Sequence, residues 1–337
     1  MEAAGMSGRS YSLFHQRLRM RQLRVLVAVA EQGSVLKAAR MLGMTQPATT
    51  RSLLEVEDYL GQRLFDRGPR GMTPNRHGDA VIRRARRVLA DLDGIPSDIA
   101  LLDSGLSEAV TVGVLISASS GLLPRVLSRF GQLHPGILIS VVEGRMHDLL
   151  AQLAGGQVDL VLGRLYEPPT ADDFVREPLY HEPLAIVARA GHPAFLRSDV
   201  DAAYLRTAAF VLPTLAQRIG QDVDLAMHEN GLKPEAPPVR ASSTSFIREM
   251  LFATDHLTML SRLTLVGDLV RGGLRLVPHP IATAPRPGGI ILRDGTAIPP
   301  AVRALKHVVE ACISELVATG FLEPHGPPAR RGAGRRD

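Results

Sequence analysis

Residues 34–53 read SVLKAARMLGMTQPATTRSL, and this stretch predicts a helix–turn–helix. Ser34 is a favourable N-cap residue, and the apolar residues that follow it recur three and four positions apart until Gly43. Thr45 is the N-cap of a second helix, which tolerates Pro47 in its first turn because early helical N–H groups have no partner within the helix. Two short helices joined by a turn that contains glycine are typical of this motif.

The outward side of the second predicted helix is polar. It carries Gln46, Thr50 and Arg51, which are suited to base edges and phosphates. Glutamine can pair with adenine, arginine with guanine, and threonine with several partners. The helix starts at Ser34 and Thr45 also present free N–H groups to phosphate oxygens. Spacing alone leaves two interpretations, a DNA-binding element and a plain helical hairpin with a polar exterior.

The residues on either side of this motif extend the predicted head. Apolar residues at positions 23, 26, 27 and 30 share one helical face and predict a preceding helix that ends at Gly33. Residues 63–77 are rich in Gly, Pro and Arg and predict a β-wing. The expected head therefore consists of three helices and a wing.

A longer helix is predicted from Gly78 onward. Its apolar residues over positions 81–92 lie on one stripe and favour a seam with a partner helix, with packing on the chain's own body as the alternative. We expect Gly94 and Pro96 to end or kink this helix. Residues 1–19 show no helical or strand period and predict a flexible N-terminal extension.

The formal net charge of +5 is unevenly distributed along the chain. Residues 1–100 carry 16 Lys and Arg against 10 Asp and Glu, whereas residues 101–322 carry 19 against 22. A basic N-terminal part on a mildly acidic body is typical of a polyanion-binding domain attached to a separate module. An ordinary solvated surface would show the same excess, so charge alone does not decide the function.

Length and composition restrict the class of protein further. The 337 residues suggest about two domains, and 45% hydrophobic with 22% charged residues is ordinary globular composition. No run approaches the roughly 20 apolar residues that span a bilayer, and residues 1–20 lack the apolar segment of a secretory signal. Cys312 is the only cysteine, which excludes an intrachain disulfide and a cysteine metal cluster. We expect a soluble cytoplasmic protein without a membrane partner.

Strand-like and helical segments alternate from Ala109 onward. This rhythm predicts an α/β fold with a parallel sheet and helices on both faces, and its repetition predicts a second α/β unit. The expected strands are residues 110–116, 137–142, 158–162, 184–190, 208–212, 239–242, 257–260 and 290–293. The expected helices are residues 122–133, 146–153, 215–230, 246–253 and 300–317.

Residues 20–78 resemble the DNA-binding domain of LysR-type transcriptional regulators. The resemblance is carried by TQPA and TR in the second helix, by LFDR at 64–67, and by Arg70, Thr73 and Pro74 in the wing. The order of the domains extends it over about residues 20–320. The chain departs from the family pattern at 75–77, where most relatives have a small residue before the glycine, and in having Pro96, which shortens the dimer-forming helix if it ends there.

The resemblance implies a fold class and a set of partners. The fold class is α/β with an all-α, winged N-terminal head: a winged helix–turn–helix domain, a linker helix and a two-subdomain effector domain like periplasmic binding proteins. It implies a DNA-binding transcriptional regulator, a homodimer or homotetramer through linker helices and effector domains, whose partners are double-stranded promoter DNA, a small-molecule effector and RNA polymerase. The expected bounds are 1–19 for the extension, 20–78 for the DNA-binding domain with its motif at 34–53, 79–106 for the linker helix, 107–322 for the effector domain (107–182 with 283–322, and 183–282) and 323–337 for a disordered basic tail.

The resemblance also implies roles for particular residues of the head. The polar face of the second helix should enter the major groove, and the wing arginines should lie against the backbone or the minor groove. Thr73 should contact a phosphate or cap the linker helix. The expected DNA-binding residues are Ser34, Thr45, Gln46, Pro47, Thr50, Arg51, Arg67, Arg70 and Thr73.

The effector site is expected beyond the carboxyl ends of the strands, where open α/β sheets bind ligands. Arg164 would be a natural partner for a carboxylate. The wing and the Ser-rich first loop resemble the branch of the family that senses aromatic acids or sugars, which implies such an effector. Each serine or threonine at a helix start is also explained as an N-cap, and Arg164 as a surface or interface residue. The expected effector-binding residues are Ser117, Ser119, Ser120, Glu143, Arg164, Thr214, Ser243 and Thr244.

Two rival classes of protein are less well supported. An α/β enzyme with an appended helical domain would need a nucleophile elbow, a phosphate-binding loop or a dinucleotide fingerprint, none of which occurs in the sequence. A solute-binding protein would leave the basic head unexplained. The histidines show no metal-ligand spacing, so we expect no catalytic residue, no metal and no cofactor.

Overall fold

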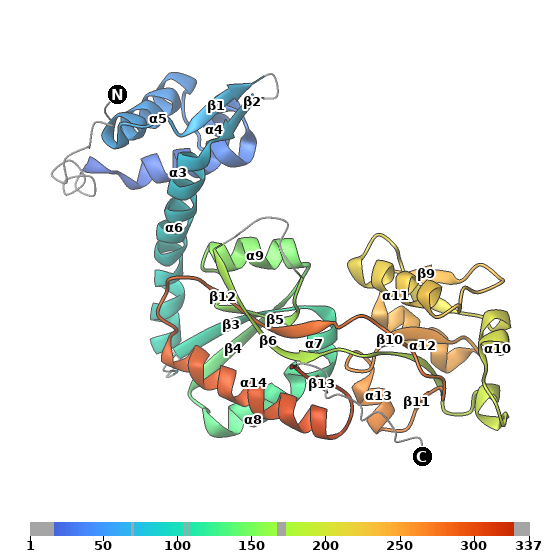
Figure 1. Cartoon of the computed structure of the whole chain (residues 1–337). Helices are drawn as coiled ribbons and strands as arrows, with labels where there is room; N and C mark the ends of the chain where they lie inside the picture. The colour runs from blue at the N-terminus through green and yellow to red at the C-terminus, as the bar shows by residue number, and fades with distance from the viewer. Residues whose placement is uncertain (1–16, 69–70, 104–105, 107, 167–172, 327–337) are drawn as a thin grey trace, which may run out of the picture. The chain divides into compact units, whose positions relative to one another are not determined.

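The computed structural model describes residues 17–68, 71–103, 106, 108–166 and 173–326 (Figure 1). The chain divides into two compact units, an N-terminal unit of residues 1–107 with 150–158 and a C-terminal unit of residues 108–149 with 159–337. No helix within these described ranges is long and apolar enough to cross a membrane. Each unit is built around its own hydrophobic cores.

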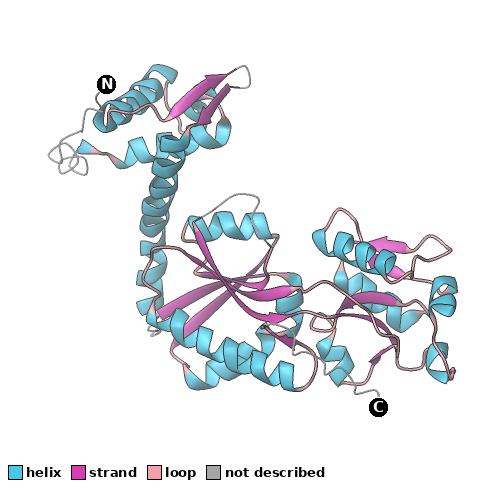
Figure 2. Ribbon diagram, viewed as in Figure 1, coloured by secondary structure: helices cyan, strands magenta, loops and turns pink. Residues whose placement is uncertain are grey.

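In the part of the N-terminal unit that the structure describes, the chain forms four helices before residue 104 and a two-stranded wing (Figure 2). Its core is formed by apolar residues on one face of each helix, among them Leu26 and Val56, together with Leu64 before the wing, and all three are fully buried. Leu18 also packs against this core, so the head begins before the residue 20 that we expected. The elements are α3 (Met20–Gln32), α4 (Val35–Met41), α5 (Gln46–Leu60), β1 (Phe65–Gly68), β2 (Gly71–Pro74) and α6 (Arg76–Asp103).

The long helix α6 differs from the expected one at both ends. It begins at Arg76, because Asn75 acts as its N-cap: Asn75 Oδ1 accepts hydrogen bonds from the backbone N–H groups of His77 and Gly78, each at 3.0 Å. The capping role considered for Thr73 therefore belongs to Asn75. The helix also continues through Gly94 and Pro96 to Asp103, so of the end or kink expected at these residues, the end does not occur. A proline removes one backbone hydrogen bond, and here the neighbouring turns continue the helix regardless.

Removing this cap should destabilise the N-terminal unit. We expect Asn75→Ala to lower its free energy of unfolding by about 1–2 kcal/mol, since two helical N–H groups lose their acceptor. Asn75 Nδ2 also donates to the backbone oxygen of Arg63 at 2.9 Å, so Asn75→Asp, which keeps the cap but loses this donor, should cost less. Urea unfolding followed by circular dichroism measures both. Equal losses for the two variants would contradict the capping role.

The first lobe of the C-terminal unit contains a six-stranded mixed sheet in the order β13-β6-β12-β5-β3-β4. β3 pairs in parallel with β4 and β5, as expected, whereas β12 and β6 pair in antiparallel fashion. The expectation of an all-parallel sheet is therefore only half right. The strands are β3 (Glu108–Val114), β4 (Ile137–Glu143), β5 (Leu160–Arg164), β6 (Phe174–His181), β12 (Pro287–Arg293) and β13 (Glu323–Pro324).

Strand β6 was absent from the expected elements because its sequence has no clean alternation. It contains Pro178, and its register against β12 shifts between Gly288 and Gly289. Such an irregularity accommodates a residue without an N–H and breaks the period of two on which strand prediction rests. β13 was also missed: Glu323 and Pro324 pair with β6, although we placed them in the disordered tail. Residues 327–337 of that tail lie outside the described residues.

Helices pack on this sheet and cover a large core. Fully buried members include Leu122, Phe130, Leu160 and Leu305. Leu263 and Val266 also belong to this core, although their sequence positions fall within the range expected for the second subdomain. The helices are α7 (Ile116–Gly121), α8 (Leu123–Leu133), α9 (Met146–Ala154) and α14 (Pro300–Ala318).

The second lobe is built on two small sheets. β7 lies between β10 and β11 in antiparallel pairing, and β8 pairs in parallel with β9. The strands are β7 (Leu184–Arg189), β8 (Val211–Pro213), β9 (Val239–Ala241), β10 (Thr258–Ser261) and β11 (Leu274–Leu276). The helices are η1 (Pro193–Leu196), α10 (Ala202–Thr207), α11 (Arg218–Glu229), α12 (Thr244–Ala253) and α13 (Val266–Val270).

Candidate functional site

Helix α5 presents one polar face to the surface. Gln46, Pro47 and Arg51 are exposed and Thr50 is half-buried. Positions 46 and 50, like 47 and 51, are four residues apart and therefore share a face of the helix. The opposite face buries Thr49, Leu53 and Val56 in the head. The core thus fixes the orientation of α5 and leaves its polar face free to meet a ligand.

Ser34 and Thr45 are N-caps, as their spacing predicts. Ser34 Oγ accepts from the backbone N–H of Lys37 at 3.5 Å, and Thr45 Oγ1 accepts from that of Ala48 at 3.4 Å. Each hydroxyl retains a proton that it can donate to a phosphate oxygen. The cap role and the predicted phosphate contact are therefore compatible.

The wing is held against the end of helix α3. The backbone N–H of Met72 donates to the carbonyl oxygen of Gly33 at 2.8 Å, and Gly71 has a φ of 109°. A Cβ at position 71 would overlap the Gly33 oxygen, so glycine is required for this close approach. Arg67 on β1 and Thr73 on β2 are exposed, whereas Arg70 lies outside the described residues.

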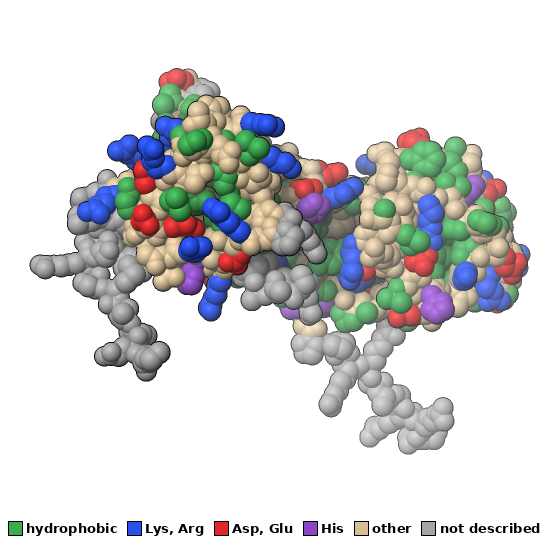
Figure 3. Space-filling view, turned by 90° about the horizontal axis from the view of Figure 1, so that it is seen from above, with side chains coloured by type: hydrophobic (Ala, Val, Ile, Leu, Met, Phe, Trp, Pro, Cys, Tyr) green, Lys and Arg blue, Asp and Glu red, His purple; other side chains and the backbone are tan. Residues whose placement is uncertain are grey.

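Basic side chains surround these elements. Blue Lys and Arg side chains project from the left-hand part of the molecule in Figure 3. The exposed basic residues of the N-terminal unit include Arg17, Arg19, Arg21, Arg24, Lys37, Arg40, Arg51, Arg63, Arg67 and Arg76. This excess of positive charge attracts polyanions.

The predicted effector residues of the first lobe follow strands that end at one edge of the sheet. Val114 of β3 lies opposite Glu143 of β4 and Leu162 of β5, so Ser117, Glu143 and Arg164 are all found at the carboxyl ends of parallel neighbours. In the second lobe, Pro213 of β8 lies opposite Ala241 of β9. Thr214, Ser243 and Thr244 accordingly follow two parallel neighbours there. Each set shares an edge, as the strand assignments predict.

Several of these residues have local partners. Ser117 is buried, and its Oγ donates to Glu182 Oε1 at 2.9 Å. Ser243 Oγ accepts from the backbone N–H of Phe246 at 3.3 Å and thus caps α12, and Thr214 Oγ1 accepts from that of Ala216 at 3.5 Å. The contact of Ser243 fits the capping interpretation, whereas Thr214 closes a local turn, because the N-cap residue of α11 is Gln217. Ser119 and Thr244 are half-buried, and Ser120 and Glu143 are exposed.

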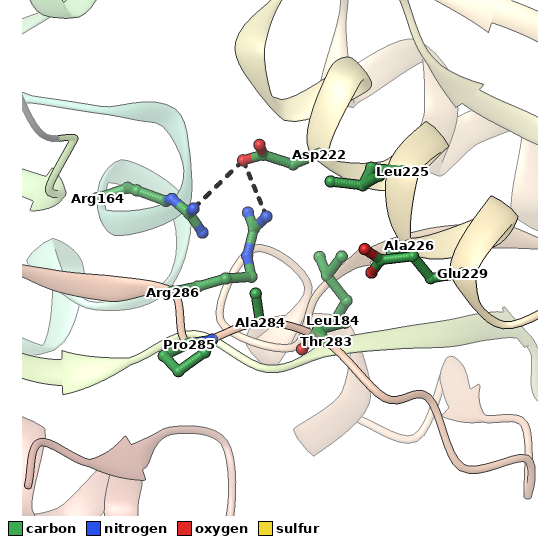
Figure 4. Close-up of a pocket in the computed structure, with 10 residues that line it drawn as sticks. All are labelled: Arg164, Leu184, Asp222, Leu225, Ala226, Glu229, Thr283, Ala284, Pro285 and Arg286. Atoms are coloured by element: carbon green, nitrogen blue, oxygen red, sulfur yellow. Dashed lines mark hydrogen bonds and ion pairs between the residues drawn. The ribbon is translucent and has the colours of Figure 1, made fainter. Parts of the chain in front are cut away.

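Arg164 lies in a pocket that joins the two lobes of this unit (Figure 4). Its Nη2 is 3.4 Å from Asp222 Oδ2 of α11, and Nη1 of Arg286 lies 2.9 Å from the same oxygen. The pocket has a volume of about 60 Å³. It is lined by Arg164, Leu184, Asp222, Leu225, Ala226, Glu229, Thr283, Ala284, Pro285 and Arg286.

The two guanidinium groups of this pocket are incompletely paired. Arg286 is 4% exposed and Arg164 has a side chain that is 13% exposed. Within the described part of the chain, Nε and Nη1 of Arg164 and Nε and Nη2 of Arg286 are buried without a hydrogen-bond partner. Burial of cationic nitrogen atoms without acceptors is costly, so this arrangement favours a hydrogen-bond acceptor that can reach these donors.

The surroundings of Arg164 shift its titration. Burial, together with the positive charge of Arg286, lowers the pKa of Arg164 below its ordinary value. Burial raises the pKa of Tyr166, whose ring lies 5.1 Å from the Arg164 guanidinium carbon. Arg218 also approaches, with its Nε 3.6 Å from Asp222 Oδ1 and its guanidinium 5.7 Å from the Tyr166 ring. The arginines and Tyr166 therefore form a positively charged, partly aromatic cluster at the pocket.

The sequence indicates Arg164 as a candidate but gives no sign of its partners Asp222 and Arg286. Asp222 and Arg286 are 64 residues apart in the chain, and neither belongs to a recognisable motif. Asp222 falls at i+4 from Arg218, which is typical of a helix-surface ion pair, and Arg286 stands between two prolines in a loop. These local patterns gave no signal for a pocket.

Histidine and acidic residues show no metal-binding arrangement in the ranges that the structure describes. His192 has a structural environment: its Nδ1 accepts from the backbone N–H of Ala194 at 3.0 Å and its Nε2 lies 3.0 Å from the backbone oxygen of Asp255. Both ring nitrogens are therefore occupied by hydrogen bonds within the lobe.

The fold defines the class of protein: a winged helix–turn–helix joined by a long helix to a two-lobed α/β module. Family comparisons agree with this. Residues 20–79 match the bacterial regulatory helix-turn-helix protein, lysR family, and residues 103–312 match the LysR substrate binding domain. The chain belongs to the LysR family of bacterial transcriptional regulators, and it is a DNA-binding regulator that responds to a small-molecule effector.

Individual relatives show how far the similarity extends. The chain is 31% identical to the HTH-type transcriptional regulator PcaQ of Agrobacterium fabrum over 83% of this chain and 90% of that protein. It is also 31% identical to the regulator GalR of Pseudomonas putida, over 88% of this chain and 74% of that protein. Full-length OxyR C199D from Pseudomonas aeruginosa has a similar fold, with a TM-score of 0.58 at 21% identity, covering 93% of this chain and 99% of that chain.

Proposed function

We propose that this regulator binds promoter DNA by placing the polar face of α5 in the major groove. Gln46 and Arg51 then reach base edges, and Pro47 and Thr50 contact the same groove beside them. Arg67, Arg70 and Thr73 of the wing, with the caps Ser34 and Thr45, contact the phosphate backbone. The observation that carries this proposal is the exposed polar face of α5 on a helix whose other face is buried in the head.

Removing Arg51 tests this placement. We expect Arg51→Ala to weaken binding to the promoter region beside the protein's own gene by about 1–3 kcal/mol, since arginine supplies a bidentate contact to guanine. Arg303→Ala, which removes an exposed arginine from α14 of the body, is the matched charge control and should leave affinity unchanged. Gel-shift titration at fixed salt measures both. Unchanged affinity and unchanged base preference in Arg51→Ala would show that Arg51 does not contact the bases.

We also propose that α6 joins two copies of the chain. Val88, Leu92, Ile95 and Ile99 are between 42% and 56% exposed and follow one another at intervals of four, three and four residues. This heptad spacing forms a seam that an isolated helix leaves in water. Earlier apolar positions of α6, Ile82 and Ala85, are instead buried in the head. The assembly is therefore a homodimer or a homotetramer.

The remaining parts of the proposed mechanism follow from this architecture. The protein acts by binding and not by catalysis, and it works in the cytoplasm, where its promoter DNA and RNA polymerase are found. The effector binds at the pocket around Arg164 or along the adjacent strand ends, which carry Ser117, Ser119, Ser120 and Glu143 on one lobe and Thr214, Ser243 and Thr244 on the other. Since Asp222 pairs with Arg164 and Arg286, an effector there changes contacts between the lobes.

A further inference from the structure

We propose that the effector is a carboxylate that takes the place of Asp222 between Arg164 and Arg286. This inference rests on the proposed function, because it names the chemistry of the molecule that the regulator senses. In the structure a single carboxylate oxygen, Asp222 Oδ2, contacts both guanidinium groups. Asp222 thereby occupies the position that an external carboxylate would take.

The free donors of the arginines have the geometry that a carboxylate needs. Nε and Nη2 of Arg286, which have no partner within the described residues, form one planar edge of its guanidinium group. Such an edge binds the two oxygens of a carboxylate through parallel hydrogen bonds. Asp222 uses only Nη1, so it leaves this edge unsatisfied. A carboxylate free to reorient can satisfy donors that Asp222, tethered to α11, does not reach.

The charges around the pocket favour replacement over simple addition. Arg164, Arg286 and Arg218 face three carboxylates: Asp222, the pocket-lining Glu229, and Glu182, which Ser117 already engages. Adding an anion to this balanced set would bring it close to Asp222, and like charges in a buried site repel strongly. Exchanging the Asp222 carboxylate for that of the effector leaves the net charge of the pocket unchanged.

The rest of the lining indicates what the carboxylate is attached to. Leu184, Leu225, Ala226 and Pro285 provide apolar walls next to the arginines. A pocket with a few polar anchors and apolar walls is typical of a small organic ligand. The expected effector is therefore a small organic acid with an apolar portion beside its carboxylate.

The experiment uses acetate as the probe on the full-length protein. Thermal unfolding is followed against acetate concentration at constant ionic strength, and the shift gives an apparent Kd. We expect Asp222→Asn to bind acetate about tenfold more tightly than the wild type, because the internal competitor has lost its charge. The matched control is Asp224→Asn on the same helix, which removes an exposed carboxylate paired with Arg240 and should behave as the wild type.

Additional ligands and variants test whether the negative charge of acetate and the two arginines are required, and they provide a substitute if one variant does not fold. Acetamide, which has the shape of acetate without its charge, should give no shift, and Arg286→Gln should abolish the response to acetate. If Arg286→Gln does not fold, Arg164→Gln serves the same purpose. Sulfate tests whether a tetrahedral anion is preferred.

Three results would overturn the inference: equal acetate affinity in Asp222→Asn and Asp224→Asn, an equal response to acetamide, or binding of sulfate without acetate. Promoter binding is measured on the same samples by gel shift. Intact promoter binding without the acetate response rejects the carboxylate inference and leaves the proposed function standing. An acetate response without promoter binding rejects the proposed function instead.

Discussion

Gly78→Ala is expected to unfold the DNA-binding head. A Cβ at this position would overlap the carbonyl oxygen of Leu64 and approach Pro74 Cβ to 3.3 Å, and these neighbours are backbone and a rigid ring. Leu64 is fully buried and Gly78 lies in the first turn of α6, so neither can move without disturbing the core. We expect a loss of about 3 kcal/mol or more in the free energy of unfolding of this unit, with promoter binding lost in parallel.

A second glycine of the same helix provides the control. Gly94 has no heavy atom within 4 Å of the position where a Cβ would be built, apart from its own helix backbone. Gly94→Ala should therefore stabilise α6 by about 0.5–1 kcal/mol, since alanine has the higher helix propensity. Urea unfolding and limited proteolysis of the full chain distinguish the two variants. Wild-type stability in Gly78→Ala would show that the close approach to Leu64 is not required.

The second large effect concerns a buried carboxylate in the second lobe of the body. Asp268 is 7% exposed on its side chain and accepts hydrogen bonds from Arg248 at 2.7 and 2.8 Å and from Arg271 at 2.9 Å. We expect Asp268→Asn to lower the free energy of unfolding by about 2–3 kcal/mol at pH 7, because Arg248 and Arg271 lose their charged acceptor. Asp255→Asn, at an exposed pair with Arg189, should cost at most about 1 kcal/mol.

The difference in unfolding free energy between the wild type and Asp268→Asn should change with pH in a direction that the pKa of Asp268 determines. The hydrogen bond from Arg248 is the main reason that the pKa of Asp268 lies below its ordinary value in the folded protein. The carboxylate therefore stabilises the fold above the unfolded-state pKa, which is about 4. This stabilisation is lost as the pH falls through the lower folded-state pKa. The stability gap between the wild type and Asp268→Asn should accordingly shrink below about pH 4, and a gap independent of pH would contradict the ion pair.

The head could be predicted from the sequence because its determinants are local. Ser34 and Thr45 cap the helices that they precede, and the exposed and buried faces of α5 follow from the spacing of Thr49, Leu53 and Val56. The sequence pattern predicts a start for α6 at Gly78, two residues later than the observed start at Arg76, because Asn75 falls within the stretch that predicts the wing. The Asn75 cap depends on backbone N–H groups only two and three residues away, so it is as local as the caps at Ser34 and Thr45.

The residues of the candidate effector site could be predicted only in part from the sequence, for a physical reason. Parallel strands place their following residues at one edge, which is why Ser117, Glu143 and Arg164 could be grouped in advance. The ion pairs that complete the pocket instead connect distant segments through Asp222. No periodicity within α11 or the loop before β12 specifies that Asp222 and Arg286 meet. The antiparallel strands of the sheet could not be predicted either, because the irregular register of β6 breaks the alternation on which strand prediction depends.

The shared oxygen of Asp222 has a consequence for the concentration range over which such a sensor responds. A molecule that competes with this tethered side chain must first release it, and the cost of that release is subtracted from the free energy of its own binding. If the proposed competition operates, the regulator responds only when the metabolite concentration is high enough to displace Asp222. Substitutions along α11 that weaken the tether would lower this threshold without altering a single atom that touches the metabolite.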